Sequence, residues 1–316
     1  MDRVAVGARP GWWWCGVVPR TLPPMKVHLI DGTYELFRHH YALPPEVNQD
    51  GQQVSAVAGV VGSILGMLER GATHVAVATD HVIKSFRNDL WPGYKDGSGL
   101  DPDILSQFGL LEDALRGLGV VVWAMVEHEA DDGLGAGAAL AAADERVSQV
   151  LICTPDKDLA QCVVGDRVVQ FDRRKRELRN ADAVVEKFGV RPTSIPDYLA
   201  LMGDSSDGYP GLAGWGAKSA SVVLARYLHI DEIPDAVSEW DVSVRGAAKL
   251  AATLAENREL ARLFRRIATV DVNAPVSDSV DDLRWSGPEV EFPSVCEQIM
   301  SPGFARRAER LAADRA

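Results

Sequence analysis

The chain has 316 residues, 47% of them apolar, which is enough for one large domain or for a large and a small one. Its formal net charge of −12 argues against binding nucleic acid through an overall basic surface, although a site built from many carboxylates would also lower the sum. No apolar run is long enough to span a bilayer, and the four cysteines form no CxxC pair. We therefore expect a cytoplasmic protein without membrane contact.

The first 24 residues differ from the rest, with Trp12, Trp13 and Trp14 adjacent among glycine, proline and arginine. The apolar stretch at 16–18 is too short for a signal peptide. We expect residues 1–24 to be a disordered or mis-assigned leader, and the folded protein to begin near Met25.

From Met25 onward, short apolar runs alternate with helical patterns. The pattern predicts strands at 27–30, 75–78, 119–124 and 150–153, and helices at 54–70, 103–118 and 130–144. In the helix at 54–70 the apolar residues recur along one continuous face, and Gly71 ends it. Strands that alternate with helices predict an α/β fold, with a parallel sheet covered on both faces.

After about residue 180 the strand patterns fade and helical patterns dominate. We expect a second, helical region at 181–290, with glycine and proline clustered at 203–216. The remaining 291–316 form a C-terminal tail, whose charged and alanine-rich end could be a surface helix or a frayed end.

Acidic residues follow the predicted strands at the ends where those strands stop. Ligands of parallel sheets bind beyond the carboxyl ends of the strands, so these acids should converge on one edge. They are Asp31, Asp80, Glu129, Asp131, Asp132, Asp156 and Asp158. A solvated loop or a helix cap would explain any single one, but the whole set cannot stay ionised together without cations. Oxygen ligands favour Mg²⁺ or Mn²⁺ over zinc, and two such ions suit in-line displacement at phosphorus.

The helical region adds Asp204 and Asp207, which one turn could present on the same side. A glycine-rich turn with Gly211, Gly214 and Gly216 then opens a helix that contains Lys218. Such a turn can offer backbone groups to a phosphate, although a plain connection between two helices would show the same pattern.

Together these residues resemble the 5′–3′ exonuclease and flap endonuclease family, which includes the amino-terminal nuclease domain of bacterial DNA polymerase I and its stand-alone relatives. The resemblance runs from about Lys26 to about Trp285. Its motifs are Leu29-Ile30-Asp31-Gly32, the stretch from Asp80 through Phe86-Arg87 to Tyr94-Lys95, Glu129-Ala130-Asp131-Asp132, Thr154 to Leu159, and Leu201 to Asp207 with the glycine-rich turn. It implies a PIN/resolvase-like nuclease domain at 25–180, with an arch at about 84–127, and a helix–two-turn–helix DNA-binding region at 181–290.

The resemblance also implies roles for single residues. The two metal ions, Mg²⁺ or Mn²⁺, would be held by Asp31, Asp80, Glu129, Asp131, Asp132, Asp156, Asp158, Asp204 and Asp207. Lys84 and Arg87 would contact the scissile phosphate from the base of the arch. Gly211, Gly214 and Gly216 would hold K⁺ against a duplex phosphate, with Lys218 on the backbone. DNA contacts are expected for Tyr34, Phe37, Tyr94 and Lys95, with ordinary packing as the alternative for the three aromatic residues.

One part of the chain departs from the family pattern. The family usually has an arginine shortly after its Tyr-Lys pair, whereas here Lys95 is followed by Asp96-Gly97-Ser98-Gly99. Between Asp96 and Glu127 the only basic residue is Arg116. The strong basic run, at 173–176, could contact phosphates or form a solvated hairpin tip.

The sequence thus predicts a metal-dependent 5′–3′ exonuclease or flap endonuclease that hydrolyses DNA in replication or repair. We expect a free-standing monomer, since no polymerase or proofreading domain follows. Two alternatives remain at this level: a non-catalytic, structure-specific DNA-binding protein that kept the fold, and a small RNase of the broader fold family. Nine clustered acids argue against the first, because binding alone has no need of them, and the glycine-rich helical region argues against the second.

Overall fold

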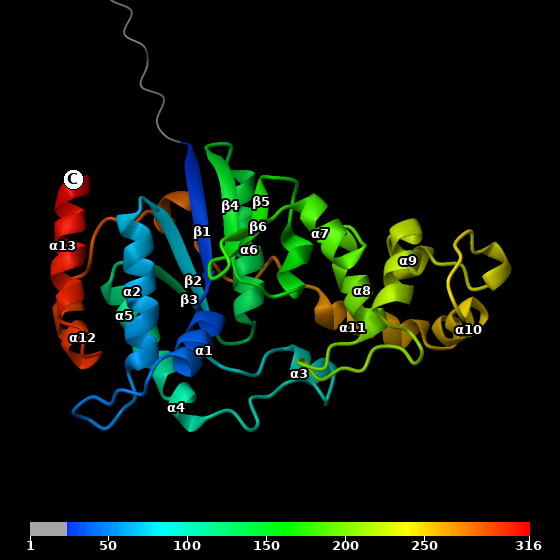
Figure 1. Cartoon of the computed structure of the whole chain (residues 1–316), viewed down its shortest axis with the longest axis horizontal. Coiled ribbons are helices and arrows are strands. Elements are labelled where there is room, and N and C mark those ends of the chain that lie inside the picture. Colours follow the sequence, from blue (N-terminus) through cyan, green and yellow to red (C-terminus); the bar gives the residue numbers. More distant parts are fainter. Residues whose placement is uncertain (1–23) are drawn as a thin grey trace, which may run out of the picture.

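The structure is a computed structural model that describes residues 24–316 (Figure 1). The leader expected at 1–24 lies, apart from Pro24, outside the described residues. The strands are β1 (Met25–Asp31), β2 (His74–Asp80), β3 (Val121–Met125), β4 (Val147–Cys153), β5 (Val168–Asp172) and β6 (Glu177–Arg179). Within the described residues they form one six-stranded sheet in the order β3-β2-β1-β4-β5-β6.

All neighbouring strands pair in parallel except β6, which runs antiparallel to β5 as the second arm of a hairpin. The central strands are apolar runs because both of their faces are covered, as in other parallel sheets. The predicted α/β fold with a parallel sheet is confirmed. All four predicted strands are present, whereas the hairpin of β5 and β6 was not predicted as strands.

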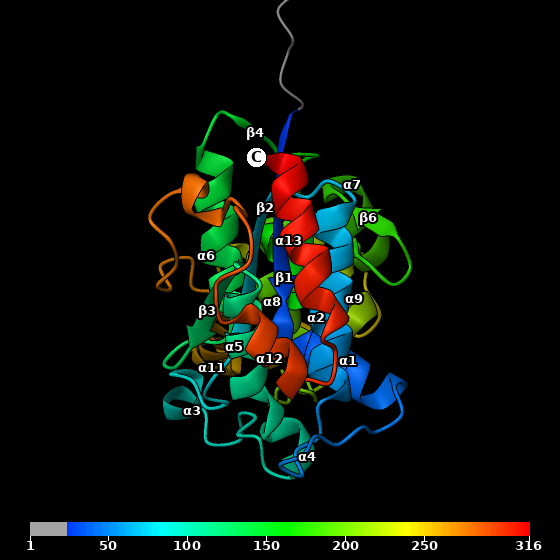
Figure 2. The same ribbon diagram turned by 90° about the vertical axis from the view of Figure 1, so that its left-hand side faces the viewer.

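One face of the sheet is covered by helices from both ends of the chain. They are α1 (Gly32–Ala42), α2 (Ser55–Glu69), α5 (Gln107–Gly117), α12 (Phe292–Gln298) and α13 (Gly303–Arg315). Figure 2 shows α13 beside α2. The end of the chain is therefore a packed helix and does not fray, because Phe292, Ala305 and Ala308 are buried in the same core as α2 and Arg307 bonds to Glu69.

The opposite face is covered by α6 (Ala130–Ala143), which lies close to the sheet. A Cβ atom at Gly137 would lie 2.4 Å from the Trp123 ring, and one at Gly133 would lie 2.4 Å from Met125. These glycines explain the alanine- and glycine-rich composition of the predicted helix at 130–144, since larger side chains would push α6 off the sheet.

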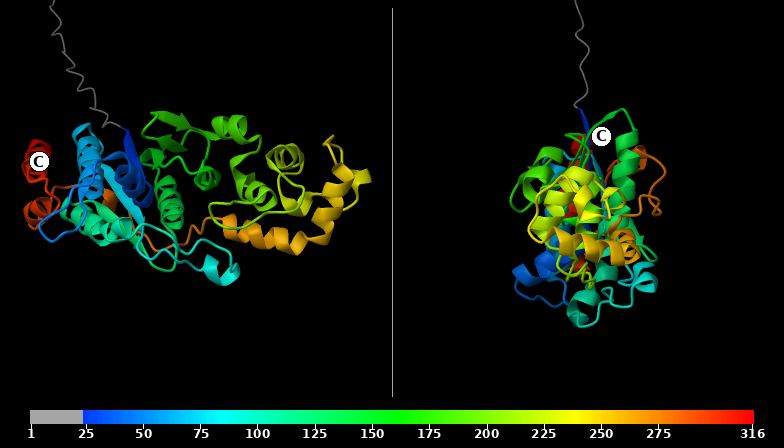
Figure 3. Two further views of the ribbon diagram at one scale, coloured as in Figure 1. Left: turned by 60° about the horizontal axis from the view of Figure 1, so that its bottom comes forward. Right: turned by 90° about the vertical axis from the view of Figure 1, so that its right-hand side faces the viewer.

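The second region is a group of helices that extends from the β6 edge of the sheet (Figure 3). It comprises α7 (Ala181–Phe188), α8 (Ile195–Met202), α9 (Ala217–Tyr227), α10 (Ala247–Glu256) and α11 (Arg258–Ala268), which share a separate apolar core. From Val270 the chain leaves these helices and returns to the sheet, where Val280 and Leu283 pack beside α6 and Trp285 joins the other core. The last part of the predicted helical region 181–290 therefore belongs to the sheet layers.

The segment expected to form the arch, 84–127, is only partly separate from the body. It contains α3 (Arg87–Leu90) and α4 (Pro102–Leu105) on loops below the sheet in Figure 1, but also α5 and β3. The predicted helix at 103–118 is divided at Ser106 into α4 and α5. Helix α1 was not predicted. Among the described residues, no helix has the length and apolar character needed to cross a membrane.

Candidate metal centre

The acidic residues meet at the carboxyl ends of the central strands. Strand β1 lies between β2 and β4, so the chain continues from β1 to β2 and from β4 to β5 on opposite sides of this point, where ligands of such sheets bind. Asp31 ends β1 and Asp80 ends β2, while Asp156 follows β4 on a short loop. Because the strands are parallel, the sequence pattern was sufficient to place these three carboxylates on one edge.

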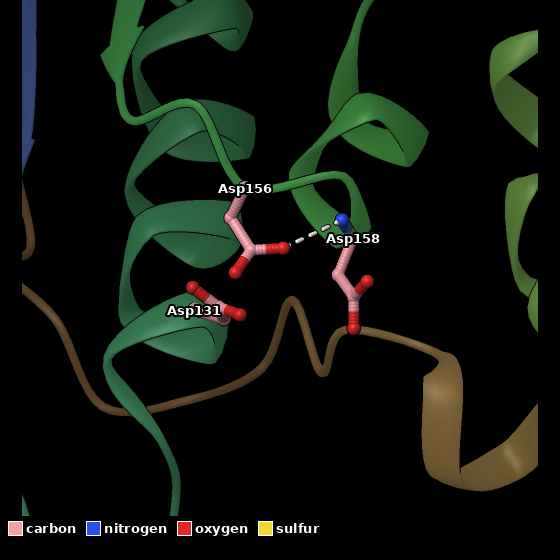
Figure 4. A group of neighbouring side chains, drawn as sticks. All are labelled: Asp131, Asp156 and Asp158. Atoms are coloured by element: carbon pink, nitrogen blue, oxygen red, sulfur yellow. Dashed lines mark hydrogen bonds between the residues drawn. The ribbon is translucent and has the colours of Figure 1, made fainter. Parts of the chain in front are cut away.

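Two groups of carboxylates are close enough to hold cations. One contains Asp131, Asp156 and Asp158, and the other contains Asp158, Asp204 and Asp207; in each, the ligand oxygens lie within 4.8 Å of one another. Figure 4 shows the carboxylates of Asp131 and Asp156 facing each other, and the backbone N–H of Asp158 donating to Asp156 over 3.0 Å. Asp158 belongs to both groups, so it is the residue that joins them.

The chemistry of these groups fits divalent cations. Asp158 Oδ1 is buried and accepts no hydrogen bond from the described residues, and its contact with Lys157 Nζ is long, at 3.9 Å. Burial, followed by the negative charge of Asp156, raises the pKa of Asp131 and of Asp158 well above the usual range. A buried oxygen without a donor and carboxyls that resist ionisation are expected where positive ions complete the site.

Asp31 and Asp80 lie beside the first group but are already bound by the protein. Asp31 Oδ1 accepts from the Tyr34 N–H and so caps α1, while its Oδ2 accepts from the Thr154 hydroxyl over 2.9 Å. Burial raises the pKa of Asp31 to about 7, and it also raises the pKa of Asp80. Asp80 Oδ1 accepts from the N–H of Ala130, which ties the start of α6 to β2.

Three predicted site residues are placed differently from the expectation. Arg87 is buried and donates two hydrogen bonds of 2.7 Å to the carboxylate of Asp132. It also donates to the carbonyl oxygens of Ile267 and Thr269. Arg87 therefore cannot reach a phosphate. Asp132 is fully buried and accepts from four donors, so it is a structural anion and does not face the two carboxylate groups.

Glu129 is the third of these residues. Its Oε1 accepts from the Ser85 hydroxyl over 2.8 Å, and its Oε2 accepts from the Tyr94 hydroxyl over 3.1 Å and contacts Lys95 Nζ. Glu129 thus connects the base of the arch to α6, next to the carboxylate groups but outside both. Tyr94 is buried by the same contact, which leaves no free ring face for an unpaired base.

We expect the substitution Arg87→Lys to reduce stability more than substrate affinity. A lysine would keep the charge but lose the paired hydrogen bonds to Asp132 and the contacts to the chain at 267–269. The free energy of unfolding should fall by about 1–3 kcal/mol. Urea unfolding would measure this change. A normal unfolding midpoint together with a raised KM would contradict the buried role and restore the expected phosphate contact.

Lys95 is a cation that borders the centre on the side of the arch base. Its Nζ lies 3.2 Å from Glu129 Oε2 and 3.0 Å from Asp207 Oδ1, and its side chain is 39% exposed. The backbone holds it in place, because the Lys95 N–H donates to the Asp207 carbonyl oxygen and the Trp91 indole donates to that of Gly208. The contacts of Lys95 with two carboxylates therefore indicate an electrostatic role for this residue more directly than they indicate the DNA contact predicted for it from the sequence.

Lys157 was not identified from the sequence. Its Nζ lies 2.5 Å from Asp204 Oδ2, so it neutralises part of the second carboxylate group. A signal was present, since a lysine between Asp156 and Asp158 in a tight turn must lie close to both acids. Lys95 and Lys157 together partly offset the negative charge of the centre.

The other residues expected to contact DNA lie around this centre. Lys84 is exposed on the loop after β2 and is near Asp96. Phe37 lines a hollow beside Asp80 and also packs on the Phe108 ring. Tyr34 is partly buried in the first turn of α1. These positions leave Lys84 accessible to a ligand.

The glycine-rich turn lies between α8 and α9. Gly211 has φ of +68°, and a Cβ atom there would collide with the backbone of Gly203 at 2.3 Å. Gly214 also has positive φ and is exposed, while Gly216 caps α9 through its N–H bond to the Ser219 hydroxyl. Lys218 is exposed in the first turn of α9. Gly211 thus shapes the turn, and Gly214, Gly216 and Lys218 form its accessible side.

The basic run at 173–176 forms the turn of the β5–β6 hairpin. Arg173 is largely buried, contacts Glu35 and donates to the Ser63 hydroxyl. Arg174, Lys175 and Arg176 are exposed at the tip. Only these three are available to an external anion.

The raised carboxyl pKa values predict that bound metal stabilises the protein more at high pH. The folded pKa of Asp31 is about 7 against an ordinary 3.8, so between these values the metal-free folded state keeps a proton that the unfolded state releases. This difference costs stability as pH rises from about 4 to about 7, by an amount on the order of 1 kcal/mol or more. Divalent ions held by the neighbouring carboxylates remove this cost, because their positive charge favours the ionised form of Asp31.

The difference in melting temperature with and without Mn²⁺, measured from pH 5.5 to pH 8, isolates this effect. The melting temperature measured without this comparison would not isolate the effect, because a histidine also contributes. Burial lowers the pKa of His28 to about 4, so this residue makes stability rise as the pH increases from about 4 to the ordinary histidine pKa of 6.5. We expect the Mn²⁺-dependent difference to grow with pH. A constant difference over that range would contradict ion binding by these carboxylates.

Comparisons with known proteins agree with this arrangement. A family model described as 5′-3′ exonuclease, N-terminal resolvase-like domain, matches residues 26–189, and one described as 5′-3′ exonuclease, C-terminal SAM fold, matches residues 190–291. DNA polymerase I of Bacillus caldotenax is 32% identical over 292 residues, which cover 88% of this chain and 32% of that protein. The chain thus spans about a third of the length of this relative.

Solved structures share the fold at low sequence identity. The T5 D15 protein, co-crystallized with metal ions, has a TM-score of 0.61 and 17% identity, and the match covers 92% of this chain and 98% of that one. The catalytic core of Rad2 in complex with DNA substrate has a TM-score of 0.55 and 14% identity, over 92% of this chain and 93% of that one. The sheet and the helical region therefore occur together in both structures.

Proposed function

The chain belongs to the 5′-3′ exonuclease family, and on this premise we propose that it is a metal-dependent 5′ nuclease that hydrolyses phosphodiester bonds of DNA. The observation that carries the proposal is the pair of carboxylate groups joined by Asp158. The family supports 5′–3′ exonuclease and flap endonuclease activity in replication or repair. A monomer acting in the cytoplasm is the simplest form of this proposal.

The carboxylates would hold two divalent ions, Mg²⁺ or Mn²⁺. Asp131 and Asp156 would bind one, Asp204 and Asp207 the other, and Asp158 would contact both. Two ions in such a site supply an activated water and stabilise the leaving oxygen of an in-line displacement. The T5 D15 protein, which shares the fold, was co-crystallized with metal ions, and this supports metal binding by the fold.

The remaining residues would orient the substrate and offset its charge. Lys95 Nζ lies between Glu129 and Asp207, so it could donate to phosphoryl oxygens when a metal ion neutralises Asp207. Lys84, which is exposed at the base of the arch, would make a second phosphate contact. Thr33 and Phe37 line the adjoining hollow, where the terminal nucleotide would fit.

We assign the duplex to the helical region. Gly214, Gly216 and Lys218 form the exposed side of the turn before α9, where backbone groups could hold K⁺ against a phosphate. The Rad2 core, a neighbour by fold, was solved with DNA substrate, which supports duplex binding by this architecture. We therefore divide the work between a catalytic region at 25–180 and a duplex-binding group of helices at 181–268.

Cleavage of a nicked duplex labelled at the 5′ end of its downstream strand tests the function. We expect short 5′ products with Mg²⁺ or Mn²⁺, none with EDTA, and none from Asp156→Ala. The same duplex with an RNA downstream strand would report a preference for RNA. A clear gel shift without cleavage by either metal would overturn the proposal and favour a non-catalytic DNA-binding protein.

A further inference from the structure

The segment that borders the centre below β2 carries negative charge. We define the arch segment as residues 96–106, in which Asp96, Asp101 and Asp103 are exposed and lysine and arginine are absent. Arg116 is the only basic residue between Asp96 and Glu127, and it contacts Glu112 and Asp113. A single strand that passed along the arch segment would therefore meet exposed acids, with exposed cations, Lys84 and Lys95, only at its base.

The arch segment is also held against the body. Ile104 is completely buried in the core between α2 and α5. Gln52 Nε2 donates to the Ser106 carbonyl oxygen over 2.7 Å, and Gln53 Nε2 donates to Asp103 Oδ2 over 2.9 Å. In Figure 1 this part of the chain runs through α4 below α1. The arch segment is thus packed against the domain and does not project from it as an open loop.

The hollow beside the arch segment is small. It has a volume of about 360 Å³ and is lined by residues that include Thr33, Phe37, Asp80, Lys95 and Asp96. This volume is near the lower end of ligand pockets, about 300–1,000 Å³, and suits a terminal nucleotide better than a strand. The one lining cation, Lys95, already contacts Glu129 and Asp207.

A cluster of exposed positive charge lies elsewhere. Arg174, Lys175 and Arg176 are at the tip of the β5–β6 hairpin, and Lys218 is on α9. Strand β6 is at the sheet edge opposite to β3, whereas the arch segment connects β2 to α5 and β3. Phosphates would therefore be attracted to the hairpin and helical side and repelled from the arch side.

On the basis of the proposed function, we propose that the arch segment selects substrates: the enzyme prefers 5′ ends at nicks, gaps and recessed duplex ends over long single-stranded 5′ flaps. Charges repel one another over distances up to the Debye length, which is about 8 Å at physiological salt. A flap phosphate that lies beside the arch segment is therefore repelled by its exposed acids. Contacts to lysine and arginine would reward a longer flap by releasing counterions, but the arch segment itself contains neither residue. A long flap thus adds repulsion without adding attraction.

Cleavage of three duplexes that differ only in the length of the 5′ flap tests this preference. They carry a nick, a single-nucleotide flap and a long flap, and kcat/KM is measured with Mg²⁺ at about 50 mM and about 200 mM salt. We expect the long flap to be cut about tenfold or more slowly than the nick at low salt, with the gap narrowing as salt screens the repulsion. A long flap cut as fast as the nick at low salt, or a preference for the nick that does not change with salt, would overturn the inference.

A pair of variants with equal charge changes locates the effect. S98R/D101N adds two positive units to the arch segment, and the asparagine side chain can still cap α4 in the way that Asp101 does. The control, S238R/E239Q, adds the same charge at exposed positions of the helical region. We expect the ratio of long-flap to nick cleavage to rise at least about threefold in the first variant only.

Cleavage of the nick by each variant shows that the variant is folded. The ratio of long-flap to nick cleavage compares two substrates with the same preparation, so it does not depend on the amount of folded protein. An equal ratio in both variants would overturn the arch segment as the selecting element. Failure of the parent protein to cut the nick at all is a different result, since it would overturn the proposed function and this inference with it.

Discussion

Replacing Asp158 by asparagine should lower kcat/KM for a nicked duplex by about 10³-fold or more. Asp158 belongs to both carboxylate groups, so its substitution weakens both ion positions, whereas any other single acid affects one. Burial and three neighbouring aspartates raise its pKa, which means that its ionised form is disfavoured in the metal-free protein. Asp158→Asn should therefore melt at a higher temperature than the parent in EDTA while losing activity.

Two measurements check this prediction together: single-turnover cleavage, and thermal unfolding in EDTA and in Mn²⁺. Asp182→Asn is the control, because Asp182 is an exposed acid on α7, outside both carboxylate groups. We expect the control to match the parent in both assays. If Asp158→Asn retained more than about a tenth of the activity, Asp158 could not join two working ion sites.

Replacing Lys95 by methionine should lower the rate of cleavage by about 10²–10³-fold, the usual loss when one preorganised donor to a developing negative charge is removed. Methionine keeps most of the chain length but no charge. Lys95 contacts the second carboxylate group through Asp207 and is also accessible, with 39% of its side chain exposed. Its position depends on the backbone bond to Asp207, which the substitution leaves in place.

Loss of a salt bridge would also disturb this site, so stability and catalysis must be separated. We expect Lys95→Met to lower kcat at saturating Mg²⁺ while the unfolding midpoint in Mg²⁺ changes little, and Lys95→Arg to recover part of the rate. Lys26→Met is the matched control, because Lys26 is exposed at the other end of β1. A normal kcat with a lowered unfolding midpoint would assign Lys95 a purely structural role.

The sequence was sufficient for the features that depend on strand direction. Asp31, Asp80 and Asp156 follow strands that are parallel, so their convergence follows from the alternation of strands and helices. Asp204 and Asp207 come within reach only because α8 packs against the turn at Asp158–Cys162, and this approach was predicted through the family resemblance, not from the pattern.

The features that the sequence did not predict depend on contacts between distant segments. Arg87 pairs with Asp132, 45 positions away, and both also bind the returning chain at 267–271. No local pattern distinguishes such a buried arginine from an exposed one at the base of an arch. Helix α1 was missed because its residues are mostly polar, and β6 because it has only three residues.

The central claim is that Asp158 lies between two divalent-ion positions. Anomalous scattering from crystals of the protein grown with Mn²⁺ tests it most directly. We predict two peaks about 4 Å apart on either side of the Asp158 carboxylate, one near Asp156 and one near Asp204. A single peak, or peaks away from Asp158, would contradict the two-ion centre proposed for this nuclease.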